Sequence, residues 1–109
     1  MRRAARTDSN QTEIVAILRS LGCSVQPLHT VGSGCPDLLI GIDGQNLLLE
    51  VKDGSKPPSA RRLTSDQQVW HTNWGGQAAI VQSLEDAIAI VSQLKSKHHA
   101  IELLPAFGK

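Results

Sequence analysis

The sequence predicts an α/β fold in which a mixed central sheet is flanked by helices, in the order αβββαβα. Two apolar runs, residues 37–42 and 45–52, are joined by Asp43-Gly44, a dipeptide typical of a two-residue β-hairpin turn. Apolar residues at helical spacing precede and follow this hairpin. The chain has 109 residues, 40% of them hydrophobic. We therefore expect residues 1–109 to form one domain around a single core.

The first helix is predicted over residues 8–21. Asp8 or Ser9 can cap its start, Gly22 is a natural stop, and an apolar stripe lies between them: Ile14, Ile17, Leu18 and Leu21. Residues 23–29 indicate a short strand with Pro27 near its edge, because proline cannot donate a ladder hydrogen bond. Residues 30–34 (TVGSG) predict a glycine-containing loop.

After the hairpin, residues 53–62 are too rich in proline, glycine, serine and charge for a regular element. Thr64 then opens a second helix, where T-S-D-Q is a capping box with Gln67 as its third helical residue, and this helix ends near Trp74. Residues 77–82 predict a short buried strand. Ser83 caps a third helix whose inward residues are expected to be Leu84, Ile88, Val91 and Leu94. Residues 100–105 (AIELLP) suggest a last strand.

The two-residue turn predicts the register of the hairpin. Ile42 faces Gln45, and counting back places Asp37 directly opposite Glu50. Side chains alternate along a strand. One face therefore carries Asp37, Leu39, Leu48, Glu50 and Lys52, and the other carries Leu38, Ile40, Leu47, Leu49 and Val51. Both faces are apolar in the middle, so we expect the hairpin to lie inside the sheet with cover on both sides.

The opposed acids raise a physical question, because two like charges facing each other beside a core are destabilising. A bound divalent cation would offset that cost, and Lys52 alone would offset part of it. Mg²⁺ or Mn²⁺ between Asp37 and Glu50, with the carbonyl of Val51 as a backbone ligand, would suit oxygen-ligand chemistry. Such a cation can bind a phosphodiester and activate water, while Lys52 can orient that water or stabilise charge on the phosphate.

The net charge of +1 does not by itself indicate a nucleic-acid-binding protein. Its distribution suggests one, because two groups of basic residues can hold phosphates: Arg2, Arg3 and Arg6 in a basic arm over residues 1–7 that can be flexible, and Lys56, Arg61 and Arg62 after the hairpin. Such runs are also common on ordinary solvated surfaces. The two cysteines lack metal-binding spacing, and the chain shows no membrane-length apolar run and no secretory signal. These features predict a cytoplasmic protein.

These residues resemble the motifs of a known nuclease family. Pro36-Asp37 followed by Glu50-Val51-Lys52 resembles the PD-(D/E)XK nuclease signature. The stretch GCPDLL, and LTSDQQVWHTNW with Gln67 and Trp70, look like the virus-type replication-repair nuclease (VRR-NUC) branch, in its small stand-alone phage and bacterial form.

The resemblance implies a restriction-endonuclease-like core, DNA cleavage dependent on Mg²⁺ or Mn²⁺, and a homodimer that resolves Holliday junctions or other branched DNA. It implies that Glu13, Asp37 and Glu50 bind the metal, that Lys52 is the catalytic lysine and that Gln67 supports the active site. A phage-encoded member would act in the bacterial host cell.

Several alternatives stay open. Glu13 lies at the border of its apolar helix face, where ordinary surface glutamates also occur. The capping box gives Gln67 a structural role, and one side chain is not expected to fill both roles. Trp70 and Trp74 are more often core or interface residues than base-stacking platforms. The chain can be a catalytically inactive nucleic-acid-binding module on the same fold, whereas a glycosidase is disfavoured because one Phe and no Tyr leave little surface for stacking sugars.

Overall fold

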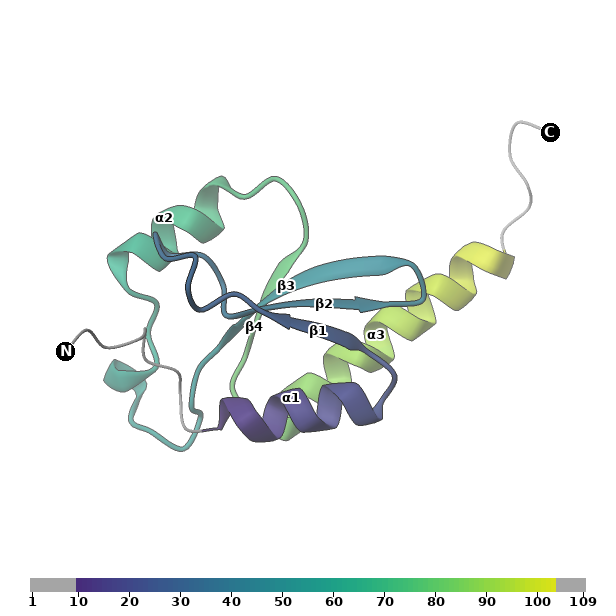
Figure 1. Cartoon of the computed structure of the whole chain (residues 1–109), viewed down its shortest axis with the longest axis horizontal. Helices are drawn as coiled ribbons and strands as arrows, with labels where there is room; N and C mark the ends of the chain where they lie inside the picture. The colour runs from purple at the N-terminus through teal and green to yellow at the C-terminus, as the bar shows by residue number, and fades with distance from the viewer. Residues whose placement is uncertain (1–9, 104–109) are drawn as a thin grey trace.

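The computed structural model describes the backbone of residues 10–103 and the side chains of residues 10–97. The elements follow the predicted order αβββαβα, with a single 3-10 turn, η1, before the second helix (Figure 1). Their bounds are α1 Gln11–Ser20, β1 Ser24–Pro27, β2 Leu38–Ile42, β3 Gln45–Val51, η1 Pro58–Ala60, α2 Ser65–Asn73, β4 Ala78–Val81 and α3 Leu84–Leu103. Over these residues, no helix combines the length and apolar character needed to span a bilayer.

The sheet is mixed and has the strand order β1-β2-β3-β4. β1, β2 and β3 pair antiparallel, and β4 runs parallel to β3. The predicted hairpin register is confirmed, since Ile42 pairs with Gln45 and Leu38 pairs with Leu49. Both turn residues have positive φ, 52° for Asp43 and 76° for Gly44, as the favoured hairpin turn requires. Because β2 and β3 lie between β1 and β4 in the strand order, the predicted position of the hairpin inside the sheet is confirmed.

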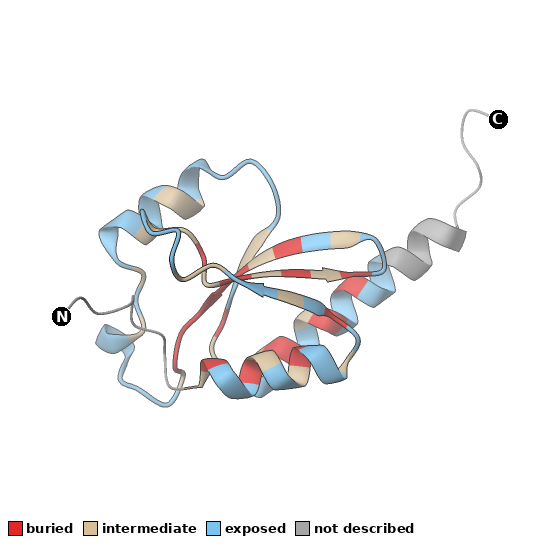
Figure 2. Cartoon of the chain, in the orientation of Figure 1, coloured by how far each residue is buried: buried red, intermediate tan, exposed pale blue. Residues whose placement is uncertain are grey.

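Helical cover is unequal on the two faces of the sheet. α1 and α3 pack against each other and against one face, where the buried side chains of the strands form the core (Figures 1 and 2). α2 lies on the other side of the sheet and contains no buried residue. Leu39 and Leu48 on that face are only half-buried and Ile80 is exposed. The expectation of cover on both sides is thus wrong for most of this face.

The ends and faces of the helices differ from the sequence prediction at three places. α1 begins at Gln11 rather than residue 8, with Asn10 as its N-cap; the predicted caps Asp8 and Ser9 lie outside the described residues. Among the described side chains of α3, residues 84–97, Ala87, Val91 and Leu94 are buried, whereas Leu84 and Ile88 are exposed. The predicted strand at 100–105 is wrong over residues 100–103, because α3 continues to Leu103; residues 104 and 105 lie outside the described residues.

The predicted inward face of α3 is wrong because it includes Ile88 and omits the buried Ala87. Ala87, Val91 and Leu94 follow the spacing i, i+4, i+7, and Ile88 is rotated by about 100° from Ala87. The small side chain of Ala87 is fully buried, which allows α3 to lie close to its neighbours. In the sequence, Ile88 was predicted to be buried in place of Ala87 because its side chain is larger and more hydrophobic.

This assignment predicts different costs for two truncations on α3. Leu94→Ala removes a side chain that is 5% exposed and should lower the free energy of unfolding by about 2–5 kcal/mol. Ile88→Ala removes one that is 44% exposed and should change it by about 0.5 kcal/mol or less. Urea denaturation of both variants tests the pair, and a larger loss for Ile88→Ala would restore the original assignment.

Candidate active site at the end of the central hairpin

Asp37, Glu50, Val51 and Lys52 gather at one end of the β2–β3 hairpin. Asp37 immediately precedes β2, Glu50 and Val51 end β3, and Lys52 follows directly. Because Leu38 pairs with Leu49, the next step of the same register places Asp37 opposite Glu50, as predicted. Alternation along the strand brings Glu50 and Lys52 to the face on which α2 lies.

The carboxylate of Asp37 is held by the backbone of β3. Its Oδ2 accepts a hydrogen bond of 2.7 Å from the N–H of Val51, and the carbonyl of Asp37 accepts one of 2.7 Å from the N–H of Leu28. A hydrogen bond to an ionised acceptor is roughly twice as strong as a neutral one. The cost of placing a second acid beside Glu50 is therefore offset within the protein, and the repulsion argument for a cation loses its force.

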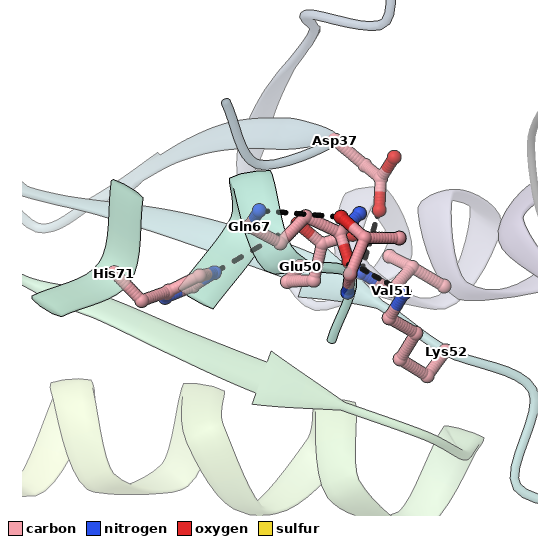
Figure 3. A network of polar contacts seen from close by, with 7 residues as sticks. Asp37, Glu50, Val51, Lys52, Gln67 and His71 are labelled. Carbon is pink, nitrogen blue, oxygen red and sulfur yellow. Dashed lines mark hydrogen bonds and ion pairs between the residues drawn. The ribbon is translucent and has the colours of Figure 1, made fainter. Parts of the chain in front are cut away.

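Glu50 and Lys52 are joined by the side-chain amide of Gln67 (Figure 3). Gln67 Nε2 donates to Glu50 Oε2 at 3.2 Å, and Lys52 Nζ donates to Gln67 Oε1 at 2.8 Å. Glu50 is 2% exposed and Lys52 is 8% exposed. Charged side chains are rarely buried this far unless they are paired and hydrogen-bonded, so this amide bridge is central to the site.

Gln67 also completes the capping box of α2. Its Oε1 accepts a 2.9 Å hydrogen bond from Thr64 N, and Thr64 Oγ1 accepts from Gln67 N at 3.2 Å. The amide oxygen has two lone pairs and the amide nitrogen has two hydrogens. One side chain can therefore serve the helix end and the site together, and the expectation that the two roles exclude each other is wrong.

His71 joins the site without having been predicted. It follows Gln67 by four residues, so both side chains leave the same face of α2, and Nε2 of His71 lies 3.8 Å from Glu50 Oε1 (Figure 3). Nε2 is buried and has no hydrogen-bond partner among the described residues. Burial lowers the pKa of His71 below 6.5, and the nearby charge of Lys52 lowers this pKa further, so the imidazole is neutral at pH 7. The i+4 spacing from Gln67 was the available signal.

Cys35, two residues before Asp37, lies in the same electrostatic environment. Burial raises the pKa of its thiol above 9.0, and the negative charges of Glu50 and Asp37 raise this pKa further. The thiol is therefore protonated at neutral pH. A protonated thiol is a poor nucleophile, which excludes Cys35 as a thiolate nucleophile at this pH.

The oxygen donors around Asp37 fit a hard divalent cation. Lys52 N donates to Val81 O on the β4 side, whereas Val51 N points to Asp37 on the β2 side. The C=O and N–H of one strand residue point the same way, so the carbonyl of Val51 lies on the side of Asp37. Within residues 10–97, no three His, Cys, Asp or Glu side chains gather as a metal cluster. Mg²⁺, however, is commonly held by one or two carboxylates together with substrate phosphates.

Glu13, the third predicted metal ligand, lies elsewhere in the described part of the chain. It is exposed on α1 and lines a cavity of about 660 Å³ together with Asp53 and Asp86. Asp37 and Glu50 do not line this cavity. The structure thus brings Asp37, Glu50, Val51, Lys52 and Gln67 together, and the assignment of Glu13 as a ligand stays a prediction.

The predicted phosphate-binding residues are only partly described. Arg61 ties the loop after β3 to the end of β4, because its Nε donates to Lys56 O at 2.8 Å and its Nη1 donates to Gln82 Oε1 at 3.0 Å. Lys56 and Arg62 are exposed. Arg2, Arg3 and Arg6 lie outside the described residues.

Gly34 sets the distance between the loop that leads to Asp37 and the first turn of α2. A Cβ at this position would overlap the carbonyl oxygen of Asp66 and would lie 2.9 Å from Gln67 N. Gly34 also has a φ of +79°, a conformation that glycine adopts readily. The backbone that precedes Asp37 therefore packs directly on the turn that carries Gln67.

This packing predicts that two glycines of one loop respond differently to alanine. Gly32 has a φ of +77° and open space around its Cβ position, so Gly32→Ala should cost only the left-handed conformation, about 1–2 kcal/mol. Gly34→Ala should cost clearly more, because it also pushes α2 away. Thermal unfolding measures both changes, and equal losses would mean that the loop does not press on α2.

A second prediction concerns the protonation of His71. Lys52→Met should raise the pKa of His71, because it removes a nearby positive charge, whereas Lys95→Met, on α3, should leave it unchanged. A histidine titration followed by NMR measures the pKa directly. Since the folded state disfavours the charged imidazole, the unfolded chain takes up the proton first, and the free energy of unfolding should fall as pH drops below about 6.5. If the pKa of His71 were unchanged in Lys52→Met, the ammonium of Lys52 would not lie near the imidazole.

We compared the chain with models of protein families, with curated proteins and with solved structures, and none of the three comparisons gave a match.

Proposed function

We propose that this protein is a metal-dependent DNA endonuclease that hydrolyses phosphodiester bonds in branched DNA, such as a four-way junction. One observation carries the proposal: a buried glutamate and a buried lysine share the amide of Gln67, next to an aspartate at the same end of the hairpin. Buried charges are costly, and their concentration beneath α2 at one end of the sheet favours a chemical role over a structural one.

Lys52 supplies the positive charge that phosphodiester hydrolysis needs. Within the described residues, its ammonium uses one of three donor hydrogens, toward the neutral amide of Gln67. That bond aims the ammonium, and the remaining hydrogens can donate to a phosphate oxygen or orient a water. A fixed donor facing charge that develops in the transition state is among the strongest catalytic contributions.

Asp37, Glu50 and the carbonyl of Val51 would hold Mg²⁺, or Mn²⁺ in its place. When bound, the cation would polarise the phosphodiester and lower the pKa of the attacking water. The Val51 N–H holds one oxygen of Asp37, and Gln67 holds one oxygen of Glu50. These hydrogen bonds orient both carboxylates before a metal arrives, which reduces the ordering cost of binding.

The substrate class and the assembly rest on the resemblance to VRR-NUC nucleases of the PD-(D/E)XK type. The resemblance would make the four-stranded mixed sheet and its helices a restriction-endonuclease-like core. A four-way junction has approximate two-fold symmetry, so a two-fold homodimer would place one site on each of two opposed strands. The exposed Lys56 and Arg62, together with the arginines of residues 1–7, would hold flanking phosphates.

A nucleic-acid-binding module without catalysis is the second candidate. It is favoured by the fact that Asp37 and Glu50 both accept hydrogen bonds from the protein, so neither acid needs a metal to be accommodated. Arranging two acids beside a lysine has no evident use in binding an anionic backbone, however, because the carboxylates repel phosphate.

The test is a cleavage assay on a labelled four-way junction and a linear duplex of the same sequence, with Mg²⁺ titrated from zero. The wild-type protein should cut the junction preferentially. Lys52→Met should lower kcat by about 10²–10³-fold with little change in DNA affinity. Asp37→Asn should abolish cleavage while it keeps an acceptor for Val51 N and therefore the fold. The matched control for Lys52→Met is Lys95→Met, which removes the charge of an exposed lysine on α3.

Three outcomes decide between the candidates. Tight junction binding without cleavage at any Mg²⁺ or Mn²⁺ concentration would select the binding module. A parallel fall of kcat and affinity in Lys52→Met would make Lys52 a phosphate anchor. Cleavage that survives Asp37→Asn at the wild-type rate would remove this site from the reaction.

A further inference from the structure

α2 borders a groove that the proposed chemistry does not use. The groove has a volume of about 480 Å³ and is lined by Ser33, Asp66, Val69, Trp70, Asn73 and Trp74. Pockets for small organic ligands typically measure about 300–1,000 Å³. Apart from Ser33, which belongs to the loop before Asp37, every lining residue lies on α2 or at its C-cap.

The two indoles form the aromatic wall of this groove. The ring centroids of Trp70 and Trp74 are 4.7 Å apart with an interplanar angle of 15°, an offset stack. Neither residue belongs to the core, and Trp74 is 47% exposed. The tryptophans were expected to be core or interface residues; the core alternative is therefore wrong, and the interface alternative stays a prediction. These are the only two tryptophans of the chain, and leaving both at the surface exposes apolar area that a ligand can cover.

The polar groups of the groove fit the edge of a nucleobase better than a phosphate. Asp66 offers a carboxylate, Asn73 an amide and Ser33 a hydroxyl, and the lining contains no lysine or arginine. A carboxylate repels phosphate but accepts hydrogen bonds from exocyclic amino groups such as that of cytosine. Unpaired bases are commonly recognised by stacking on aromatic side chains combined with hydrogen bonds to their edges.

The groove and the candidate active site both include residues of α2. At a rise of 1.5 Å per residue, Trp70 lies about 4.5 Å and Trp74 about 10.5 Å along the helix direction from Gln67. Gln67 is bonded to Glu50 and Lys52, so a base against the indoles would belong to a nucleotide near the phosphate held at those residues. Base-paired nucleotides cannot enter without unstacking, which costs a few kcal/mol, whereas a base at a branch point is already less constrained.

We propose that the groove formed by Ser33, Asp66, Trp70, Asn73 and Trp74 binds one unpaired nucleobase of the DNA substrate and thereby selects branched over continuous duplex DNA. The inference rests on the proposed function, because it names the feature of the substrate that the same site recognises. Stacking against the tryptophans provides affinity, and Asp66 favours a base that carries an exocyclic amino group.

The test measures binding without cleavage, in EDTA, to three four-way junctions that differ only at the branch point. One is fully paired, one carries an unpaired cytosine, and one carries an abasic residue at that position. The cytosine junction should bind roughly 5- to 100-fold more tightly than the abasic one. Because all tryptophan emission comes from the groove, it should change with the cytosine junction and much less with the abasic one.

Variants locate the effect. Trp74→Ala should abolish the preference for cytosine over the abasic junction, and Trp74→Phe, which keeps an aromatic ring, should retain part of it. Ile88→Ala removes a similarly exposed apolar side chain from α3 and should retain all of it. Urea unfolding of the four proteins verifies that the compared chains are folded, and the Phe variant keeps the test decisive if the Ala variant is unstable.

Equal affinity for the cytosine and abasic junctions would overturn the proposal. Tryptophan emission that changes with protein concentration in the absence of DNA would also overturn it, by assigning the indoles to an interface between copies of the chain. Base-dependent binding without cleavage in Mg²⁺ would support base binding in the groove and contradict the proposed nuclease function. Cleavage without any base preference would support the nuclease and remove the groove.

Discussion

The amide of Gln67 is the interaction on which the local structure depends. It accepts from Thr64 N and from Lys52 Nζ and donates to Glu50 Oε2, so three parts of the chain meet at one planar group. Loss of this amide would leave a buried ammonium, a buried carboxylate and a helix N-terminus with one partner fewer. Unsatisfied buried groups cost more than a hydrogen bond contributes when made. The same side-chain amide therefore fixes both the geometry of the site and the start of α2.

Elements with strong local signals were predictable from the sequence. Asp43-Gly44 set the hairpin and its register, and the capping box located the start of α2 within one residue. The predictions failed where distant packing decides. Ala87 is buried in place of Ile88 because of the way α3 meets the sheet and α1, and residues 100–103 extend a helix although their composition also suits a strand. Neither outcome has a signature within a short window of sequence.

In the candidate site, too, the positions of the residues were predictable from the sequence and the directions of their side chains were not. The register brought Asp37, Glu50 and Lys52 to one end of the hairpin in the sequence alone, because alternation and turn type are local rules. The direction of each carboxylate was not accessible, since Asp37 turns to Val51 N and Glu50 turns to a helix seventeen residues further along the chain. Repulsion between two acids predicted a cation, but hydrogen bonds perform that task. The proposal of a metal therefore rests on the oxygen donors present and on the proposed reaction, not on the stability of the folded chain.

α2 is joined to the rest of the chain by hydrogen bonds of Gln67 and by its capping box. It has nine residues and none is buried, and a helix of this length is marginal in water without support. That support comes from the capping box, the close approach at Gly34 and the bonds of Gln67. Ligand-binding elements are commonly drawn from the less stable parts of a fold. Any molecule that binds the groove or the site only in the folded state will stabilise α2 by mass action. Because Gln67 and Trp70 lie on this helix and Trp74 is its C-cap, the proposed binding of a base in the groove would also order the helix turn that aligns Lys52.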